Sequence, residues 1–154
     1  NRLVERVNRE LAVDALTPSH RVDTAVGAGD VTCARFGAID RLAPFGRGNP
    51  RPALLAEGVA VAAPPRIVGK SGDHVSLSVR FDGQTVKAIG FGMADRVGEV
   101  GQGARIDALF EPQINEWQGR TSAEMRLIDW RPARRGAGAD PARETEMAMA
   151  EDGR

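Results

Sequence analysis

The fold of this chain is decided by HVSLSVRFDGQTVKAIGF, residues 74–91. Apolar and polar side chains alternate from His74 to Phe81, which is the pattern of a β-strand with one buried face. Asp82-Gly83 predicts a two-residue turn, because glycine tolerates the positive φ that such turns require, and residues 84–91 then return as a second strand. The stretch therefore predicts a β-hairpin. Its expected inward side chains are Val75, Leu77, Val79 and Phe81.

The segments around this hairpin predict further strands and a short helix. Pro64-Pro65 interrupts an upstream strand that bends, and glycines end the short helix downstream. The order strand, strand, strand, helix, strand, strand is that of a five-stranded OB-type barrel, with a small SH3-like barrel as the alternative. The predicted segments are a bent strand at 59–62 and 66–69, the helix at 93–100, strands at 105–111 and 121–130, and a turn at 115–119.

The residues before the barrel predict helices and then a rigid connector. Apolar residues recur at helical spacing over 3–16, and Asp30 is the predicted N-cap of a second helix that runs to Leu42. Prolines and glycines at 44–52 exclude helix and strand there. The predicted fold class is therefore mainly β, an OB-type barrel preceded by an α-helical segment. The expected inward residues of the second helix are Val31, Ala34, Ala38 and Leu42.

Composition and charge exclude several classes of protein. The 154 residues carry 21 Lys and Arg against 21 Asp and Glu, so bulk charge cannot hold nucleic acid or an anionic membrane. No apolar run reaches the roughly 18 residues of a membrane span. The single cysteine, Cys33, cannot form an internal disulfide, which fits the reducing cytoplasm. The chain starts without Met, and we expect it to be part of a longer protein.

The sequence offers no constellation of residues for catalysis. His20 and His74 stand 54 positions apart, and neither has a second metal ligand nearby. Gly69-Lys70-Ser71 resembles the end of a phosphate-binding loop, but Pro64 occupies the position where that motif needs glycine. We therefore expect a binding module without a catalytic site, metal or cofactor of its own.

Binding of nucleic acid is better supported. OB barrels bind single strands in a groove where basic side chains neutralise phosphates and aromatic side chains stack on bases. Trp117 lies at a predicted hairpin tip, where it either stacks on a base or a partner or folds back over the barrel mouth. For each basic residue the alternative to DNA contact is a position on a solvent-exposed strand face without a binding role. The basic candidates are Arg66, Lys70, Arg80, Lys87, Arg120 and Arg126.

The other aromatic residues divide between core and surface. Phe81, Phe110 and Trp130 fall on apolar positions of the predicted strands and are expected in the core. Phe91, between two glycines, is assigned neither to the core nor to the surface. Residues 59–132 hold nine Lys and Arg and nine Asp and Glu, so we expect weak DNA binding that falls steeply with salt.

A family resemblance adds to this interpretation. LAPFGRGNPRP, residues 42–52, closely resembles the connector of bacterial RecJ-type single-stranded-DNA-specific exonucleases. The resemblance runs from about residue 15 to residue 132, and its most specific parts are this connector and the Asn-Glu-Trp turn. Further matching segments are VGK at 68–70, HVSL at 74–77, AIGFG at 88–92, NEWQGR at 115–120 and DWRP at 129–132.

The resemblance implies a 5′-to-3′ exonuclease that acts on single-stranded DNA in recombination and repair. In that family a DHH domain holds Mn²⁺ or Mg²⁺, which activates water, and a DHH-associated domain with a Gly-Gly-His motif holds the DNA. Neither motif is present here, so no catalytic residue or metal ligand is assigned and the chain alone is expected to be inactive. The implied partners are single-stranded DNA and the missing catalytic domains, with a single-strand-binding protein or a helicase as further candidates and no membrane.

The resemblance also divides the chain and adds site residues. It implies the helical end of the DHH-associated domain at 1–43, the connector at 44–56 and the OB domain at 57–132. The residues after Pro132 show no repeated apolar face, which predicts a disordered tail at 133–154. Instead of contacting DNA, Asn49 would in the alternative interpretation fix the backbone geometry of the connector. The alternative function of the whole domain is protein docking, in which the OB domain recruits a helicase or a single-strand-binding protein. The predicted nucleic-acid-binding residues are Arg47, Asn49, Lys70, Arg80, Lys87, Trp117, Arg120 and Arg126.

Overall fold

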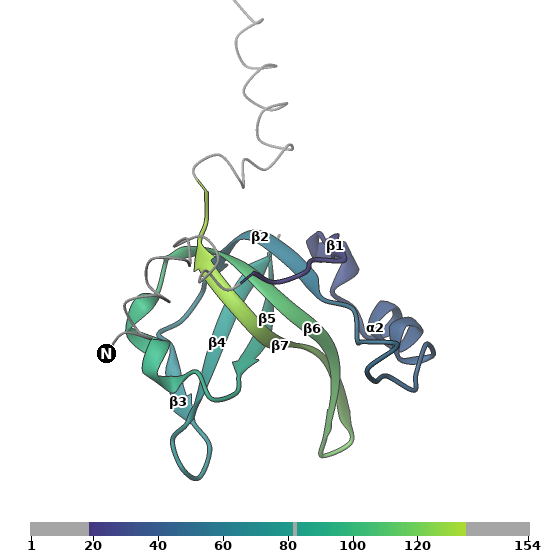
Figure 1. The fold of residues 1–154 in the computed structure, drawn as a ribbon. Helices are drawn as coiled ribbons and strands as arrows, with labels where there is room; N and C mark the ends of the chain where they lie inside the picture. The colour runs from purple at the N-terminus through teal and green to yellow at the C-terminus, as the bar shows by residue number, and fades with distance from the viewer. Residues whose placement is uncertain (1–18, 82, 135–154) are drawn as a thin grey trace, which may run out of the picture.

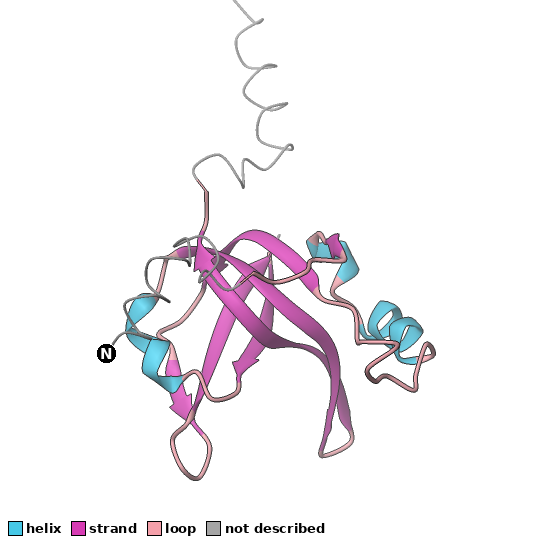
Figure 2. Cartoon of the chain, in the orientation of Figure 1, coloured by secondary structure: helices cyan, strands magenta, loops and turns pink. Residues whose placement is uncertain are grey.

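Five strands close into a barrel in the computed structural model, which describes residues 19–81 and 83–134 (Figures 1 and 2). Around the barrel the strands follow the order β2, β6, β7, β5 and β4, and β4 pairs again with β2. All of these pairs are antiparallel except β5 with β7. This is the predicted OB-type barrel. Its strands are β2 (Leu54–Val61), β4 (His74–Phe81), β5 (Gln84–Gly90), β6 (Arg105–Trp117) and β7 (Arg120–Pro132).

Two short strands extend the sheet to seven, where the sequence predicted five. β1 (Thr24–Ala25) runs parallel to β2, and β3 (Arg66–Val68) runs antiparallel to β4. β2 and β3 together are the predicted bent strand, because both pair with β4 on either side of Pro64-Pro65. The helix predicted at 3–16 and all but the first two residues of the tail predicted at 133–154 lie outside the described residues.

β2 begins at Leu54, before the predicted start at residue 59 and inside the predicted connector. A bulge between Ala56 and Val59 explains the difference, because it breaks the alternation on which the prediction depended. Gly58 adopts a φ of +63° within the bulge. The buried Asp107 carboxylate accepts a hydrogen bond from the Gly58 N–H at 3.0 Å.

The core fills the barrel as the alternation predicts. Val75, Leu77 and Val79 are fully buried on β4. The aromatic residues assigned to the core, Phe81, Phe110 and Trp130, are all buried as well. The two-residue turn after β4 is supported by the pairing of Phe81 with Gln84 and by Gly83, whose φ is +83°. Residue 82 lies outside the described ranges.

The second predicted helix is shorter than expected and has a different cap. It is α2 (Cys33–Asp40), preceded by the 3₁₀ turn η2 (Ala28–Asp30). Thr32, not Asp30, is the N-cap, because its hydroxyl accepts a hydrogen bond from the Arg35 N–H. Phe36 is the buried residue of α2 and packs on Phe110 at a centroid distance of 6.3 Å. The expected inward residues Ala34 and Leu42 are exposed, because the larger Phe36 takes the core position.

The last hairpin is longer than predicted. The short helix η3 (Ala94–Glu99) leads into β6, which continues to Trp117 instead of ending at residue 111. Asn115, expected in a turn, pairs with Ser122 of β7. Figure 1 shows the far half of this hairpin projecting beyond the barrel beside α2. None of the helices among the described residues is long and apolar enough to cross a lipid bilayer.

Candidate nucleic-acid interface

One polar face of the sheet crosses β4, β5, β7 and β6. Its members follow from the register, since Ile89 of β5 lies opposite Arg126 of β7, and Arg126 lies opposite Glu111 of β6. Every second residue of each strand shares this surface, which we call the polar face. Its members include Ser76, Ser78 and Arg80, then Thr85, Lys87 and Ile89, then Arg120, Ser122, Glu124 and Arg126, and Glu111, Gln113, Asn115 and Trp117.

A cavity of about 840 Å³ lies on the polar face near the tip of the last hairpin. The structure brings together three of the predicted site residues around it, Lys87, Trp117 and Arg120. We call it the hairpin cavity. Its lining residues are Lys87, Asn115, Trp117, Gln118, Arg120 and Ser122.

Trp117 is held out at the tip of the hairpin. Its side chain is 70% exposed, so of the two predicted positions the structure shows the outward one. Trp117 pairs with Arg120 across a two-residue turn. Gln118 and Gly119 both have positive φ, at 49° and 74°, which is the geometry of the tight turns that suit the twist of a hairpin. The turn therefore places an indole and a guanidinium side by side at the mouth of the cavity.

Carboxylates already pair with two of the basic residues on the polar face. Lys87 Nζ lies 3.4 Å from Glu124 Oε1, and Glu124 also accepts a hydrogen bond from Asn115 Nδ2 at 3.0 Å. Glu124 is only 8% exposed, so these partners compensate its burial. Arg126 Nη1 lies 3.4 Å from Glu111 Oε2. The polar face is therefore less basic than its arginines and lysine suggest.

Arg120 and Lys70 are two of the exposed cations near this region. Neither has an ion-pair partner within residues 19–81 and 83–134. Lys70 lies in the loop between β3 and β4. Figure 1 shows this loop and the tip of the last hairpin projecting on the same side of the barrel.

The remaining predicted residues are not gathered with these. Arg80 is on the polar face but lies opposite Thr85, at the end of β4 away from His74. Arg47 lies in the connector, which Figure 1 shows beside α2. Neither Arg47 nor Arg80 lines either of the cavities on this face.

Asn49 is occupied within the connector itself. Its Nδ2 donates hydrogen bonds to the carbonyl oxygens of Leu42 at 3.0 Å and Pro44 at 3.1 Å. Gly46 and Asn49 also exchange backbone hydrogen bonds as an isolated bridge. These contacts correspond to the alternative interpretation of Asn49, in which it fixes the backbone geometry.

Sequence reasoning missed several residues of the polar face. Asn115 was assigned to a turn, because the strand before it was expected to end earlier, and Ser122 was placed in the predicted strand 121–130 without a role in binding. Glu124 was missed because buried carboxylates are rare and the sequence alone shows no partner. The signal that could have found Asn115 is its two-residue spacing from Trp117, which continues the strand alternation.

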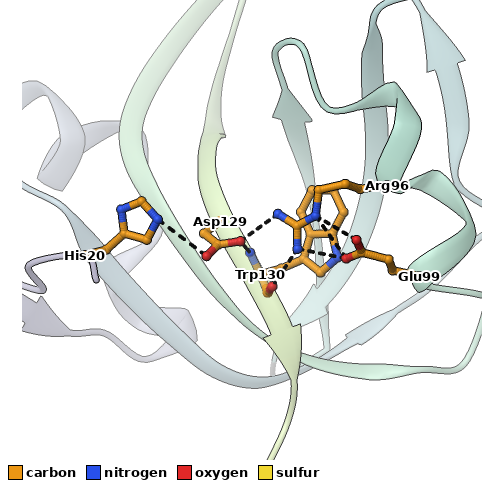
Figure 3. Close-up of polar contacts among 5 residues, drawn as sticks. All are labelled: His20, Arg96, Glu99, Asp129 and Trp130. Carbon is orange, nitrogen blue, oxygen red and sulfur yellow. Dashed lines mark hydrogen bonds and ion pairs between the residues drawn. The ribbon is translucent and has the colours of Figure 1, made fainter. Parts of the chain in front are cut away.

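A second polar cluster lies where η3 packs on β7 (Figure 3). Arg96 forms ion pairs with Glu99 at 2.8 Å and Asp129 at 2.7 Å, and its guanidinium lies 4.2 Å from the centroid of the Trp130 ring. Asp129 also lies 3.5 Å from His20. The hydrogen bonds from Arg96 hold the pKa of Glu99 below its ordinary value. These ion pairs join η3 and the segment before β1 to the barrel.

The part of the chain that the structure describes contains no group of three or more His, Cys, Asp or Glu side chains arranged to hold a metal ion. The described residues therefore do not fit the Mn²⁺ or Mg²⁺ that the family resemblance implies. No chemical step through a metal is derived for them.

Comparisons with known proteins give a consistent result. The family model described as RecJ OB domain matches residues 22–129. The chain is 30% identical over 129 residues to the single-stranded-DNA-specific exonuclease RecJ of Bacillus subtilis (strain 168), covering 84% of this chain and 16% of that protein. The chain thus corresponds to a small part of the length of this relative.

Two solved structures share the fold with a TM-score of 0.50. RecJ in complex with Mg²⁺ from Thermus thermophilus is 22% identical, over 71% of this chain and 16% of that one. A putative aspartyl-tRNA synthetase from Leishmania major Friedlin is 13% identical, over 85% of this chain and 25% of that one. At these identities the likeness concerns the fold alone.

Proposed function

We propose a single-stranded DNA-binding role for this chain, which belongs to the RecJ OB domain family. The observation that carries the proposal is the hairpin cavity, where the exposed Trp117 stands beside Lys87 and Arg120. In OB folds, oligonucleotides bind across the second and third barrel strands between the loops of the first and last hairpins. Here those parts are β4, β5, the β3–β4 loop with Lys70 and the β6–β7 tip.

Each group in the cavity has a distinct expected task. Trp117 stacks on a base, which is sequence-tolerant because every base presents a π-face. Arg120 and Lys87 neutralise phosphates, and Asn115 and Ser122 offer uncharged hydrogen-bonding groups beside them. The cavity is open and lies on the surface, which suits a continuous strand better than a small molecule.

We also propose that the whole protein is a RecJ-like 5′-to-3′ exonuclease that acts in DNA recombination and repair in the cytoplasm. The identity to the Bacillus subtilis enzyme supports this proposal. In it, hydrolysis with Mn²⁺ or Mg²⁺ belongs to catalytic domains outside this chain, and this chain holds the single strand on its path to them. The chain alone should not degrade DNA.

A protein-docking role is the second candidate. The observation that favours it is the pairing of Lys87 and Arg126 with Glu124 and Glu111, which reduces the positive charge of the polar face. An exposed tryptophan also serves protein recognition, because it buries a large apolar area. In this case Trp117 would contact a single-strand-binding protein or a helicase.

Fluorescence anisotropy separates the two candidates. A labelled thymidine oligonucleotide of about 15 nucleotides, close to the site size of OB folds, is titrated with the chain at low and at physiological salt. We expect saturable binding. Trp117→Ala should weaken it roughly tenfold, because stacking on one aromatic contributes about 1–3 kcal/mol per base.

Two further variants make the result specific. Trp117→Phe keeps an aromatic ring and should retain part of the affinity. Leu42→Ala removes a side chain that is 60% exposed but lines neither cavity of the polar face, so it should change nothing. Absence of binding at low salt, or full affinity in Trp117→Ala, would reject the DNA-binding role of this cavity and leave protein docking as the better explanation.

A further inference from the structure

A second cavity on the polar face has a composition of its own. It measures about 310 Å³ and lies beside Phe91, one residue after β5, and we call it the Phe91 cavity. The residues proposed for DNA binding above account for only Arg126 among its walls. Its lining residues are Arg51, Phe91, Glu111, Pro112, Gln113 and Arg126.

Phe91 presents an aromatic surface that the barrel does not use. Its side chain is 50% exposed, although it follows the buried end of β5. The Arg126 guanidinium lies 5.6 Å from the centroid of its ring, within the range of a cation–π interaction. A planar aromatic ligand could stack on this ring and keep the guanidinium contact, because arginine stacks on bases as it does on aromatic side chains.

His74 holds the Phe91 ring in place. The two rings meet edge to face at a centroid distance of 5.0 Å. His74 Nδ1 accepts a hydrogen bond from the Gly92 N–H at 3.1 Å, which fixes the turn that carries Phe91. Stacking on a ring that is already positioned costs less conformational entropy than stacking on a mobile one.

The polar wall of the cavity includes a carboxylate, Glu111. A carboxylate only accepts hydrogen bonds, and Glu111 has one oxygen near Arg126, at 3.4 Å. Cytosine and adenine present an exocyclic amino group as donor, whereas thymine presents the O4 acceptor in its place. A thymine whose O4 faces Glu111 would therefore set two acceptors against each other.

We propose that the Phe91 cavity is a nucleobase pocket that prefers bases with an exocyclic amino group over thymine. The base stacks on Phe91, and Glu111 accepts a hydrogen bond from its amino group. The inference rests on the proposed function, since the base reaches the pocket as part of a single strand. Phe91 and Glu111 are the specificity-determining residues, and His74 is a positioning residue.

Nucleotide titrations test the pocket without relying on the oligonucleotide groove. The 154-residue chain is titrated with deoxycytidine 5′-monophosphate and, separately, with thymidine 5′-monophosphate, while backbone amide signals are followed by NMR. We expect the Gly90 and Gly92 amides to shift with the cytidine nucleotide and much less with the thymidine nucleotide. Phe91→Ala should abolish the response, and the exposed control Leu42→Ala should keep it.

Oligonucleotide binding then tests selectivity. Deoxycytidine oligomers should bind about three- to tenfold more tightly than thymidine oligomers, the factor that one net hydrogen bond gives. Glu111→Gln should remove this preference, because an amide both donates and accepts. His74→Ala should weaken the cytidine response with Phe91 still present, whereas Phe91→Leu should lose stacking without losing the fold.

The outcomes distinguish this inference from the proposed function. If the amides near Phe91 respond to neither nucleotide, or respond equally to both, the base pocket is wrong even where Trp117→Ala still weakens oligonucleotide binding. If the cytidine nucleotide shifts these amides but no oligonucleotide binds, the pocket stands and the single-stranded DNA role fails.

Discussion

One amide side chain holds the connector in shape. Asn49 donates to the carbonyls of Leu42 and Pro44, so Asn49→Ala should lower stability by about 1–2 kcal/mol through two lost hydrogen bonds. DNA affinity measured without denaturant should stay unchanged. Urea unfolding and anisotropy of the same variant check both statements. A variant that unfolds like the parent chain but loses DNA binding would show that Asn49 contacts the strand.

Glu99 makes part of the stability depend on pH. Its hydrogen bonds from Arg96 lower its pKa from the ordinary value of 4.5 in the folded state. The unfolded chain therefore binds a proton at Glu99 at higher pH than the folded chain does. The resulting stabilisation is complete above pH 4.5 and is lost as the pH falls through the folded-state pKa.

Replacing this carboxylate should make the free energy of unfolding fall less steeply as the pH is lowered. Urea unfolding of Glu99→Gln between about pH 7 and pH 3 should show a smaller loss of stability than the parent chain. Glu57→Gln removes an exposed carboxylate of β2 for comparison and should leave the curve unchanged. Identical curves for the parent chain and Glu99→Gln would mean that the pair with Arg96 contributes nothing in solution.

The bulge in β2 depends on a buried carboxylate of the neighbouring strand. Asp107 is 2% exposed, accepts from the Gly58 N–H and pairs with Arg131 Nε at 3.0 Å. Asp107→Ala should therefore lower the free energy of unfolding by about 2–3 kcal/mol, because a buried donor loses its acceptor. Asp107→Asn keeps an acceptor for Gly58 and should cost less. Equal stability of the alanine variant and the parent chain in urea unfolding would contradict this role.

The barrel strands could be predicted because each has one buried face. In β4 the alternation of Val75, Leu77 and Val79 identifies both the strand and its inward side, and the tight turn after it identifies the partner. The prediction failed where another contact replaced alternation. The bulge at Gly58 depends on a hydrogen bond to Asp107, which lies far along the chain. The N-cap of α2 is Thr32 and not the predicted Asp30, because the Thr32 hydroxyl accepts the hydrogen bond from the Arg35 N–H.

The candidate site was predicted by residue type but not by its extent. Trp117, Arg120 and Lys87 were identified because exposed aromatic and basic residues suit single strands. Their meeting around one cavity depends on the length of the last hairpin, which packs Ile114 near Gly37 of α2. Contacts of this kind join distant segments, and a single sequence with no structure does not show them.

The whole barrel carries a nearly balanced charge, so its pairing pattern decides how DNA would be held. Lys70, Lys87, Arg120 and Arg126 border the proposed path, but Lys87 and Arg126 face carboxylates. A cation that is paired with a carboxylate in the free protein must break that pair before it binds a phosphate. Its binding therefore releases fewer counterions than the binding of a cation that has no ion-pair partner. The pairing therefore predicts a smaller dependence on salt than four independent cations would give.

The salt dependence of binding tests this arrangement directly. For single strands the slope of log K against log salt is about −0.7 for each neutralised phosphate, so two unpaired cations predict a slope of about −1.4, and four predict about −2.8. Glu124→Gln keeps the acceptor for Asn115 but releases Lys87, and should raise affinity at low salt and steepen the slope by about 0.7. Glu57→Gln changes the net charge equally on β2, which pairs with neither β5 nor β7, and should leave the slope as it is. If both variants behave alike, total charge governs binding and Lys87 lies outside the interface.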